Sequence, residues 1–391
     1  MGIVRTGFNG ERLKSARLFR RMTIAELAEI TDISKQAISQ FENKKTEPRA
    51  ETLFNLSNAL GFPRQYFYQE IKSDVVSGDT YFRSLASMTN KDRMEQIERV
   101  NNLVAIYRGI SEFIEFPDIN LYQVPEDFDL DDIEELATNV REYWGLGKSC
   151  IKNIIDVMER NGIIVCSVHT DNKKIDAYSR VERIDGSSYA IVVLGDDKED
   201  PYRRNFSAAH ELGHLLLDDF YNLEDMSRVD YKAMEDKMNY FAGALLVPAD
   251  VYRLDLQTFR KTELSHYLHL KQKYGVSAAA LIFRARQLNE ITQSQYQYLM
   301  RQISIKGYRT REPISNETKK IEPRYIKEAM KMIIEEDKTT SAEFIEVLTR
   351  QGTTLSSDII ENVLGLEEGY MSLNDTKFEN IVLFRKKTSN A

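Results

Sequence analysis

The sequence of 391 residues has few of the features that stabilise secreted or membrane proteins. It contains only two cysteines, too few for a disulfide framework or a thiolate zinc site, so histidines and carboxylates would have to hold any metal. No apolar run approaches the roughly 18 residues that a membrane-spanning helix needs, and the first residues lack the apolar core of a signal peptide. We therefore expect a cytoplasmic protein with no membrane partner.

Proline (8 residues) and glycine (18 residues) are also sparse, and the 42% hydrophobic and 29% charged content is typical of globular proteins. The length predicts two or three domains. The net charge is −8, yet residues 1–70 contain 11 basic and 8 acidic side chains. This first segment is therefore the part of the chain that could meet a polyanion.

Hydrophobic periodicity and turn residues predict a mostly helical chain. Residues 10–68 predict five short helices, the polar stretch at 72–90 predicts a linker, and apolar residues three or four apart at 91–116 predict a long amphipathic helix. From about residue 130, helices alternate with β-rich runs at 163–168 and 188–194, which is α+β patterning.

The string HELGH at residues 210–214 is the most specific chemical signal in the sequence. It follows Asp200 and Pro201, which predict the start of a helix that extends to about residue 217. The two histidines, four positions apart, share one face of such a helix and can bind one ion, while Glu211 can reach a water molecule on that ion. The pattern predicts a zinc site with Glu211 as general base.

A hydrolytic zinc site needs a third protein ligand. Glu235 is the best candidate, because it lies in the next strongly helical segment, and the neighbouring Asp236 is the alternative. A histidine pair at this spacing can also be a hydrogen-bonded core pair without a metal, which is the structural alternative.

The segment YRRNFSAAHELGHLLLD, followed by EDKMNYFAGALLVP, resembles the ImmA/IrrE family of metallo-endopeptidases, and the resemblance extends over about residues 133–312. It implies a zincin-like α+β fold in which His210, His214 and Glu235 bind Zn²⁺ and Glu211 is the catalytic residue. It also implies a protein substrate, since this family commonly acts on a repressor with an Xre-type domain.

Residues 23–43, TIAELAEITDISKQAISQFEN, have the layout of a helix-turn-helix motif. Ser34 is expected to cap the second helix, whose early residues enter the DNA major groove in such motifs. Gln36 can pair with adenine, and Lys35 can approach guanine or a phosphate. The predicted DNA-binding residues are Lys35, Gln36, Ser39, Gln40, Asn43, Lys44 and Lys45.

Residues 8–68 are similar to the Xre/Cro family of repressor domains. The similarity implies a five-helix, lambda-repressor-like domain that binds a double-stranded DNA operator, with a homodimer as the expected assembly. Asp32 and Lys44 stand at turn positions where glycine is frequent, so we expect strained left-handed conformations there. The alternative is a docking module, because the net charge of this segment is weak for a DNA-binding domain.

These signals predict a multidomain, mostly α-helical chain with one α+β catalytic domain. The predicted order is a helix-turn-helix domain, a linker with an amphipathic helix, a zinc metallopeptidase domain and a helical region of unknown role, at residues 1–71, 72–128, 129–312 and 313–391.

Two functional hypotheses fit this order. The first is a DNA-binding transcriptional regulator with a zinc-dependent endopeptidase domain that cleaves a repressor-type protein in a stress or mobile-element response. The second is a DNA-binding repressor whose peptidase-like domain senses a ligand or partner and has little hydrolytic activity. The presence of the base and of all three predicted ligands favours the first.

Overall fold

The structure is a computed structural model, and it separates into two compact units that we describe one at a time. The first unit contains Met1–Ile71, Met94–Glu115 and Ile326–Ala391, and the second contains Lys72–Arg93 and Phe116–Tyr325. Residues 72–88 of the predicted linker at 72–90 lie outside the described residues. The residues that the structure describes are 7–70, 89–168, 177–195, 200–221, 226–258, 260–309, 312–313, 315 and 320–375.

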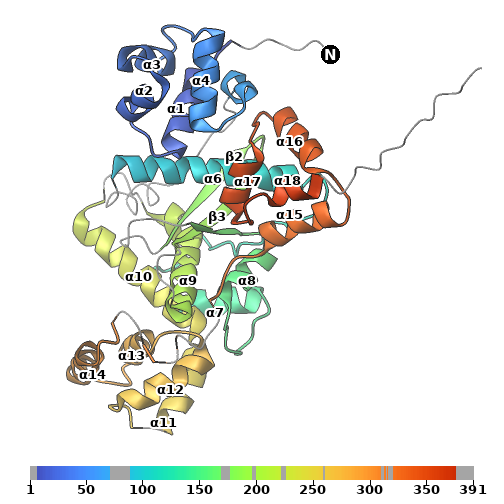
Figure 1. Cartoon of the computed structure of the whole chain (residues 1–391). Coiled ribbons are helices and arrows are strands. Elements are labelled where there is room, and N and C mark those ends of the chain that lie inside the picture. The colour runs from blue at the N-terminus through green and yellow to red at the C-terminus, as the bar shows by residue number, and fades with distance from the viewer. Residues whose placement is uncertain are drawn as a thin grey trace, which may run out of the picture. The chain divides into compact units, whose positions relative to one another are not determined.

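The first unit is helical and consists of three chain segments (Figure 1). Its elements are α1 (Gly10–Phe19), α2 (Ile24–Thr31), α3 (Lys35–Glu42), α4 (Ala50–Leu60), the 3-10 helix η1 (Arg64–Tyr68), α6 (Asn90–Ile110), α15 (Tyr325–Glu335), α16 (Ser341–Arg350), α17 (Ser357–Leu364) and α18 (Tyr370–Asp375). The five short helices predicted for residues 10–68 are confirmed, the fifth as a 3-10 helix. The predicted helix at 91–116 is also confirmed, but it ends earlier, at Ile110.

The C-terminal helices pack on the helix-turn-helix segment and on α6 within this unit. The side-chain amide of Gln69 donates to Thr354 Oγ1 at 2.7 Å and accepts the Thr354 backbone N–H at 2.7 Å. Gly109 of α6 lies against α16, where an added Cβ would be only 2.6 Å from Leu348 Cδ2. Residues after 325 therefore share a compact unit with the helix-turn-helix segment.

The second unit combines helices with one small sheet. Its elements are α7 (Ile133–Tyr143), α8 (Ile154–Arg160), β1 (Ile164–Val168), β2 (Ala177–Ile184), β3 (Ser187–Gly195), α9 (Pro201–Leu217), the 3-10 helix η3 (Asp218–Phe220), α10 (Arg228–Leu246), α11 (Ala249–Gln257), α12 (Leu264–Tyr274), α13 (Ala278–Gln287) and α14 (Gln293–Ile305). The prediction of a mostly helical chain with an α+β unit is confirmed. Helix α8 starts at Ile154 because the Asn153 side chain caps it by accepting the Asp156 backbone N–H.

The described strands form a three-stranded sheet in the order β1-β3-β2. The strands predicted at 163–168 and 188–194 are confirmed as β1 and β3, which run parallel. Strand β2, which we did not predict, pairs antiparallel with β3. Its charged residues Arg180 and Glu182 are both buried and form an ion pair, so buried positions of this strand do not look hydrophobic in the sequence.

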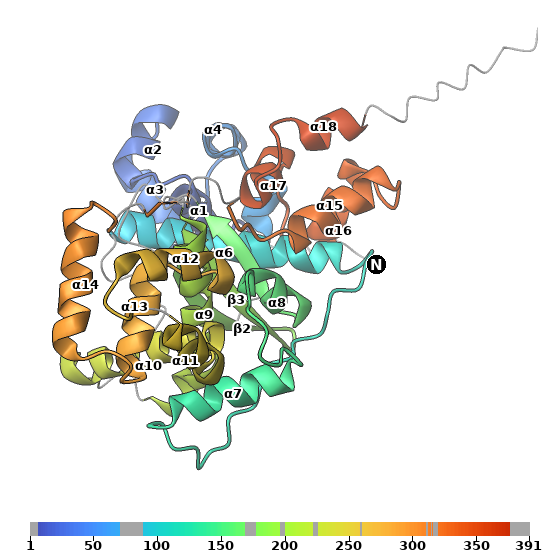
Figure 2. The same cartoon turned by 90° about the horizontal axis from the view of Figure 1, so that it is seen from below.

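Helix α9 is the central helix of this unit and packs against β2, β3, α8 and α10. It begins as predicted, with the Asp200 carboxylate accepting the backbone N–H groups of Tyr202 and Arg203, and it ends at Leu217. Helices α12, α13 and α14 pack on one another farther along the chain (Figure 2). The boundaries that we predicted for the domains remain predictions.

Candidate functional site

The HELGH string lies in the C-terminal half of α9. His210 and His214 are one helical turn apart on the same face, and their Nε2 atoms are 3.2 Å apart. His214 is buried, with 4% of its side chain exposed, whereas the His210 side chain is 15% exposed. Two histidine nitrogens thus point toward one small volume that is open to solvent on the His210 side.

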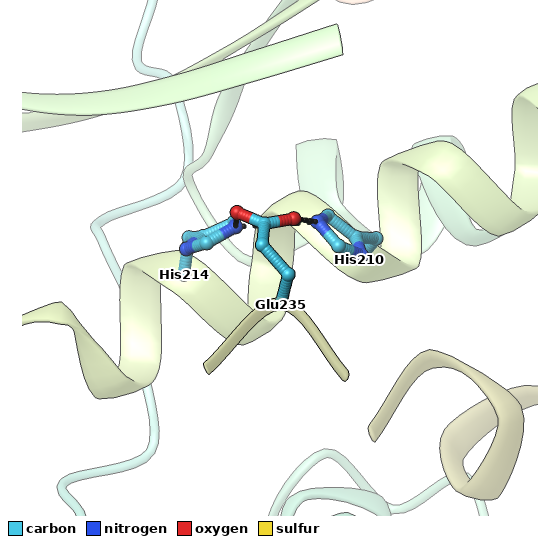
Figure 3. A group of neighbouring side chains, drawn as sticks. All are labelled: His210, His214 and Glu235. Atoms are coloured by element: carbon cyan, nitrogen blue, oxygen red, sulfur yellow. Dashed lines mark hydrogen bonds and ion pairs between the residues drawn. The ribbon is translucent and has the colours of Figure 1, made fainter. Parts of the chain in front are cut away.

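Helix α10 brings Glu235 to these two nitrogens (Figure 3). Its Oε2 atom lies 3.2 Å from His210 Nε2, and its Oε1 atom lies 3.5 Å from His214 Nε2. The neighbouring Asp236, our alternative third ligand, is exposed. Gly213 allows the close approach of α10, because an added Cβ there would lie 3.1 Å from Met238 Sδ.

The spacing of the three side chains fits one tetrahedral metal ion. Zinc binds nitrogen and oxygen ligands at about 2.0–2.1 Å, so two ligands of a tetrahedron lie roughly 3.3 Å apart. The three separations here are 3.2, 3.2 and 3.5 Å. One histidine pair and one carboxylate would leave the fourth position open, as a catalytic site requires. The residues therefore fit a metal.

Hydrogen bonds at the Nδ1 atoms orient both imidazole rings for binding a metal ion through Nε2. His210 Nδ1 lies 3.2 Å from Asn239 Oδ1, and His214 Nδ1 lies 3.0 Å from Asp218 Oδ1. The Asn239 amide is itself fixed, because its Nδ2 donates to the Glu235 carbonyl oxygen at 2.8 Å. Acceptors at Nδ1 place the proton there and leave the Nε2 lone pair for a cation. We predicted neither outer residue, although each follows a site residue by four helical positions.

The protonation behaviour of these groups reflects their mutual attraction. Burial lowers the pKa of His214, but its bonds to Asp218 and Glu235 outweigh burial and raise the pKa from 6.5 to about 10. Burial raises the pKa of Glu235, and the bonds to both histidines outweigh it, so the pKa lies well below 4.5. The pocket therefore favours positive charge between its ligands, the electrostatic condition for a bound cation.

Glu211 points from α9 toward the sheet and is buried, with 7% exposed. Its Oε2 atom accepts a hydrogen bond of 2.8 Å from Ser179 Oγ on β2. Burial is the largest influence on the Glu211 carboxyl and raises its pKa above 4.5, although both site histidines act in the opposite direction. Sequence reasoning missed Ser179 because it missed the strand that carries it.

The helix-turn-helix segment has the predicted local geometry. The Ser34 hydroxyl accepts the Ala37 backbone N–H at 3.1 Å and caps α3. Asp32 and Lys44 both have the left-handed conformation expected for them, with φ of 54° and 57°. The motif thus forms without glycine at its two turns.

Most of the predicted DNA-binding side chains lie at the surface of α3 and of the turn after it. Lys35, Gln36, Asn43, Lys44 and Lys45 are exposed, and Ser39 and Gln40 are half-buried. Asn43 Nδ2 donates to the Ser39 carbonyl oxygen at 2.7 Å, and Lys44 Nζ lies 2.9 Å from Glu11 Oε1. DNA would have to replace the Asn43–Ser39 and Lys44–Glu11 contacts. Among the described residues, the side chains of Lys35 and Gln36 make no hydrogen bond or ion pair that DNA would have to break.

None of the described helices is both long and apolar enough to cross a membrane.

Comparison with known families agrees with both parts of this geometry. Residues 10–72 match the family described as Helix-turn-helix domain, and residues 158–286 match the peptidase family described as IrrE N-terminal-like domain. A search of curated proteins found no significant match to the chain. The second matched range contains α9, α10 and the candidate metal site. The chain therefore carries an XRE-type helix-turn-helix domain fused to an IrrE/ImmA-like domain of a metallopeptidase family.

Proposed function

We propose that this chain is a DNA-binding transcriptional regulator with a zinc-dependent endopeptidase activity, and that it cleaves a repressor-type protein. The supporting observation is the convergence of His210, His214 and Glu235, whose ligand atoms lie within 4.8 Å of one another. A buried carboxylate, Glu211, follows the first of these residues directly. Two imidazoles and one carboxylate are a donor set typical of catalytic zinc.

The roles of the residues follow from their positions. His210, His214 and Glu235 would hold a zinc ion, which supplies a Lewis acid for the scissile carbonyl and for the attacking water. Glu211 would take the proton from that water and deliver it to the leaving amine. Burial supports this role, because a raised pKa increases the affinity of Glu211 for the proton that it must carry.

The DNA-binding part of the proposal uses α3. Gln36 and Lys35 lie in the first turn of this helix and are exposed, which supports contacts to base edges in a major groove. Asn43, Lys44 and Lys45 would then contact the phosphate backbone, which contributes affinity and carries no sequence information.

Zinc content and a matched pair of variants test the peptidase activity. Purified protein is expected to hold about one zinc per chain, as the three-ligand site implies. Glu211→Gln should abolish cleavage of an Xre-type repressor substrate, together with derepression in cells. Glu235→Gln should lose zinc, whereas the neighbouring exposed variant Asp236→Asn should retain zinc and activity.

Derepression that survives Glu211→Gln would contradict the peptidase proposal and favour the sensor hypothesis.

For the DNA-binding part, Gln36→Ala should reduce discrimination at one operator base pair by roughly 1–3 kcal/mol. The control is Gln65→Ala, which changes another exposed glutamine of the same segment. Equal discrimination at that base pair by both variants would contradict the base-reading role of Gln36, and a wild-type chain that binds no operator would favour the docking module.

A further inference from the structure

We propose that Ser179 is a positioning residue that holds the Glu211 carboxylate in its reactive orientation; the proposal rests on the peptidase function proposed above. Ser179 Oγ donates to Glu211 Oε2 at 2.8 Å, and both residues are buried, at 6% and 7% exposed. A hydrogen bond to a carboxylate in such surroundings is strong, because little water competes for either partner.

The backbone of β2 fixes the position of Ser179. Ser179 pairs with Val192 of β3 in the antiparallel ladder, and paired residues present their side chains to the same face of the sheet. Val192 belongs to the hydrophobic core that also contains Ala208 and Leu212 of α9. The strand therefore carries the serine hydroxyl to α9 on a rigid support, independent of the metal-ligand helices.

The hydrogen bond from Ser179 gives the two oxygens of Glu211 different roles in the reaction. Oε2 accepts the hydrogen bond from the Ser179 hydroxyl, so Oε1 remains to take the proton of the attacking water. After that transfer the new O–H bond lies at Oε1, and Ser179 still donates to Oε2, which has become the carbonyl oxygen. Oε1 then releases this proton to the leaving amine, so Glu211 ends the cycle as a carboxylate.

This role predicts a specific kinetic pattern for substitutions at position 179. Ser179→Ala should lower kcat by about 10- to 100-fold, the range expected for loss of one hydrogen bond to a charged group. KM should change little, since the serine does not bind substrate. Ser179→Thr should restore kcat to within a few-fold of wild type, because threonine keeps the hydroxyl and suits a strand.

The experiment uses the full-length zinc-loaded chain and a purified Xre-type repressor as substrate. Ser188→Ala is the matched control, because it removes an exposed hydroxyl from the adjacent strand β3. Zinc content should be the same in the wild type and all three variants, and thermal unfolding should show each variant folded at the assay temperature. A Ser179→Ala variant with wild-type kcat, or a Ser179→Thr variant as slow as Ser179→Ala, would overturn the proposal.

Crystal structures of the zinc-loaded wild type and Ser179→Ala provide a second readout that needs no turnover. Glu211 should have one conformer in the wild type, with Oε2 bonded to Ser179, and should leave that position or adopt several conformers in the alanine variant. An unchanged Glu211 conformer would overturn the positioning role. If Glu211 moves as expected but the wild type cleaves nothing, the positioning role stands and the proposed peptidase function fails.

Discussion

Glu159 of α8 is expected to make the second unit less stable as the pH rises from about 5 to 8. Burial is the largest influence on its carboxyl and raises the pKa from 4.5 to about 7. The backbone N–H groups of Tyr325 and Arg324 donate to Oε1, both at 2.9 Å, and lower the pKa, as does the Arg324 charge, whereas Asp156 raises it. Oε2 has no hydrogen-bond partner among the described residues.

The sign and size of the effect follow from proton linkage. In the unfolded chain this carboxyl has its ordinary pKa of 4.5, so a folded pKa of about 7 means that the folded protein binds the proton more tightly. The stability contribution of Glu159 is therefore complete below pH 4.5 and is lost as the pH rises through 7. A difference of about 2.5 between the two pKa values corresponds to about 3 kcal/mol.

Glu159→Gln tests this expectation, because an amide oxygen can accept the same two N–H groups without becoming charged. Urea unfolding can be followed by the fluorescence of Trp144, the single tryptophan, whose Nε1 donates to the Asn120 carbonyl oxygen at 2.8 Å. The unfolding free energy of the variant minus that of the wild type should increase by about 2.5 kcal/mol between pH 5 and pH 8. The control is Glu142→Gln, an exposed residue of α7. A difference that stays constant over this range would refute the reasoning.

Three further substitutions test other parts of the fold. Lys271 is fully buried and donates to Glu312 Oε2 at 3.0 Å, so Lys271→Ala, which leaves that carboxylate buried without its cation, should cost about 3–5 kcal/mol in the same urea assay. Asp32→Gly should stabilise the helix-turn-helix segment by up to about 1 kcal/mol, measured by thermal unfolding, because glycine relieves a φ of 54°. A destabilised variant would contradict that expectation. Gln69→Ala and Thr354→Val should show a coupling free energy of about 0.5–1.5 kcal/mol in a double-mutant cycle, since the Gln69 side-chain amide donates one hydrogen bond to Thr354 Oγ1. Additive effects would mean that the two side chains do not interact.

Local signals account for the parts of the fold that the sequence predicted well. Asp200 with Pro201 marks the start of α9, and Ser34 marks the start of α3, because caps act within one helical turn. The four-residue spacing of His210 and His214 likewise depends only on helix geometry. The proximity of Glu235 is different, because it depends on how α10 packs, and it was expected from resemblance to a family rather than from spacing alone.

Ser179 illustrates why the remaining part of the site could not be predicted. It is 32 residues from Glu211, and no periodicity connects a residue of one strand with a residue of a later helix. The strand itself was also hidden, since its buried positions include Arg180 and Glu182, whose charges neutralise each other within the protein. A hydrophobicity pattern treats these two residues as exposed, although pairing is what allows their burial. Residues that act through contacts between distant segments, such as Ser179 on Glu211, therefore become visible only when the sheet and the helix are placed together.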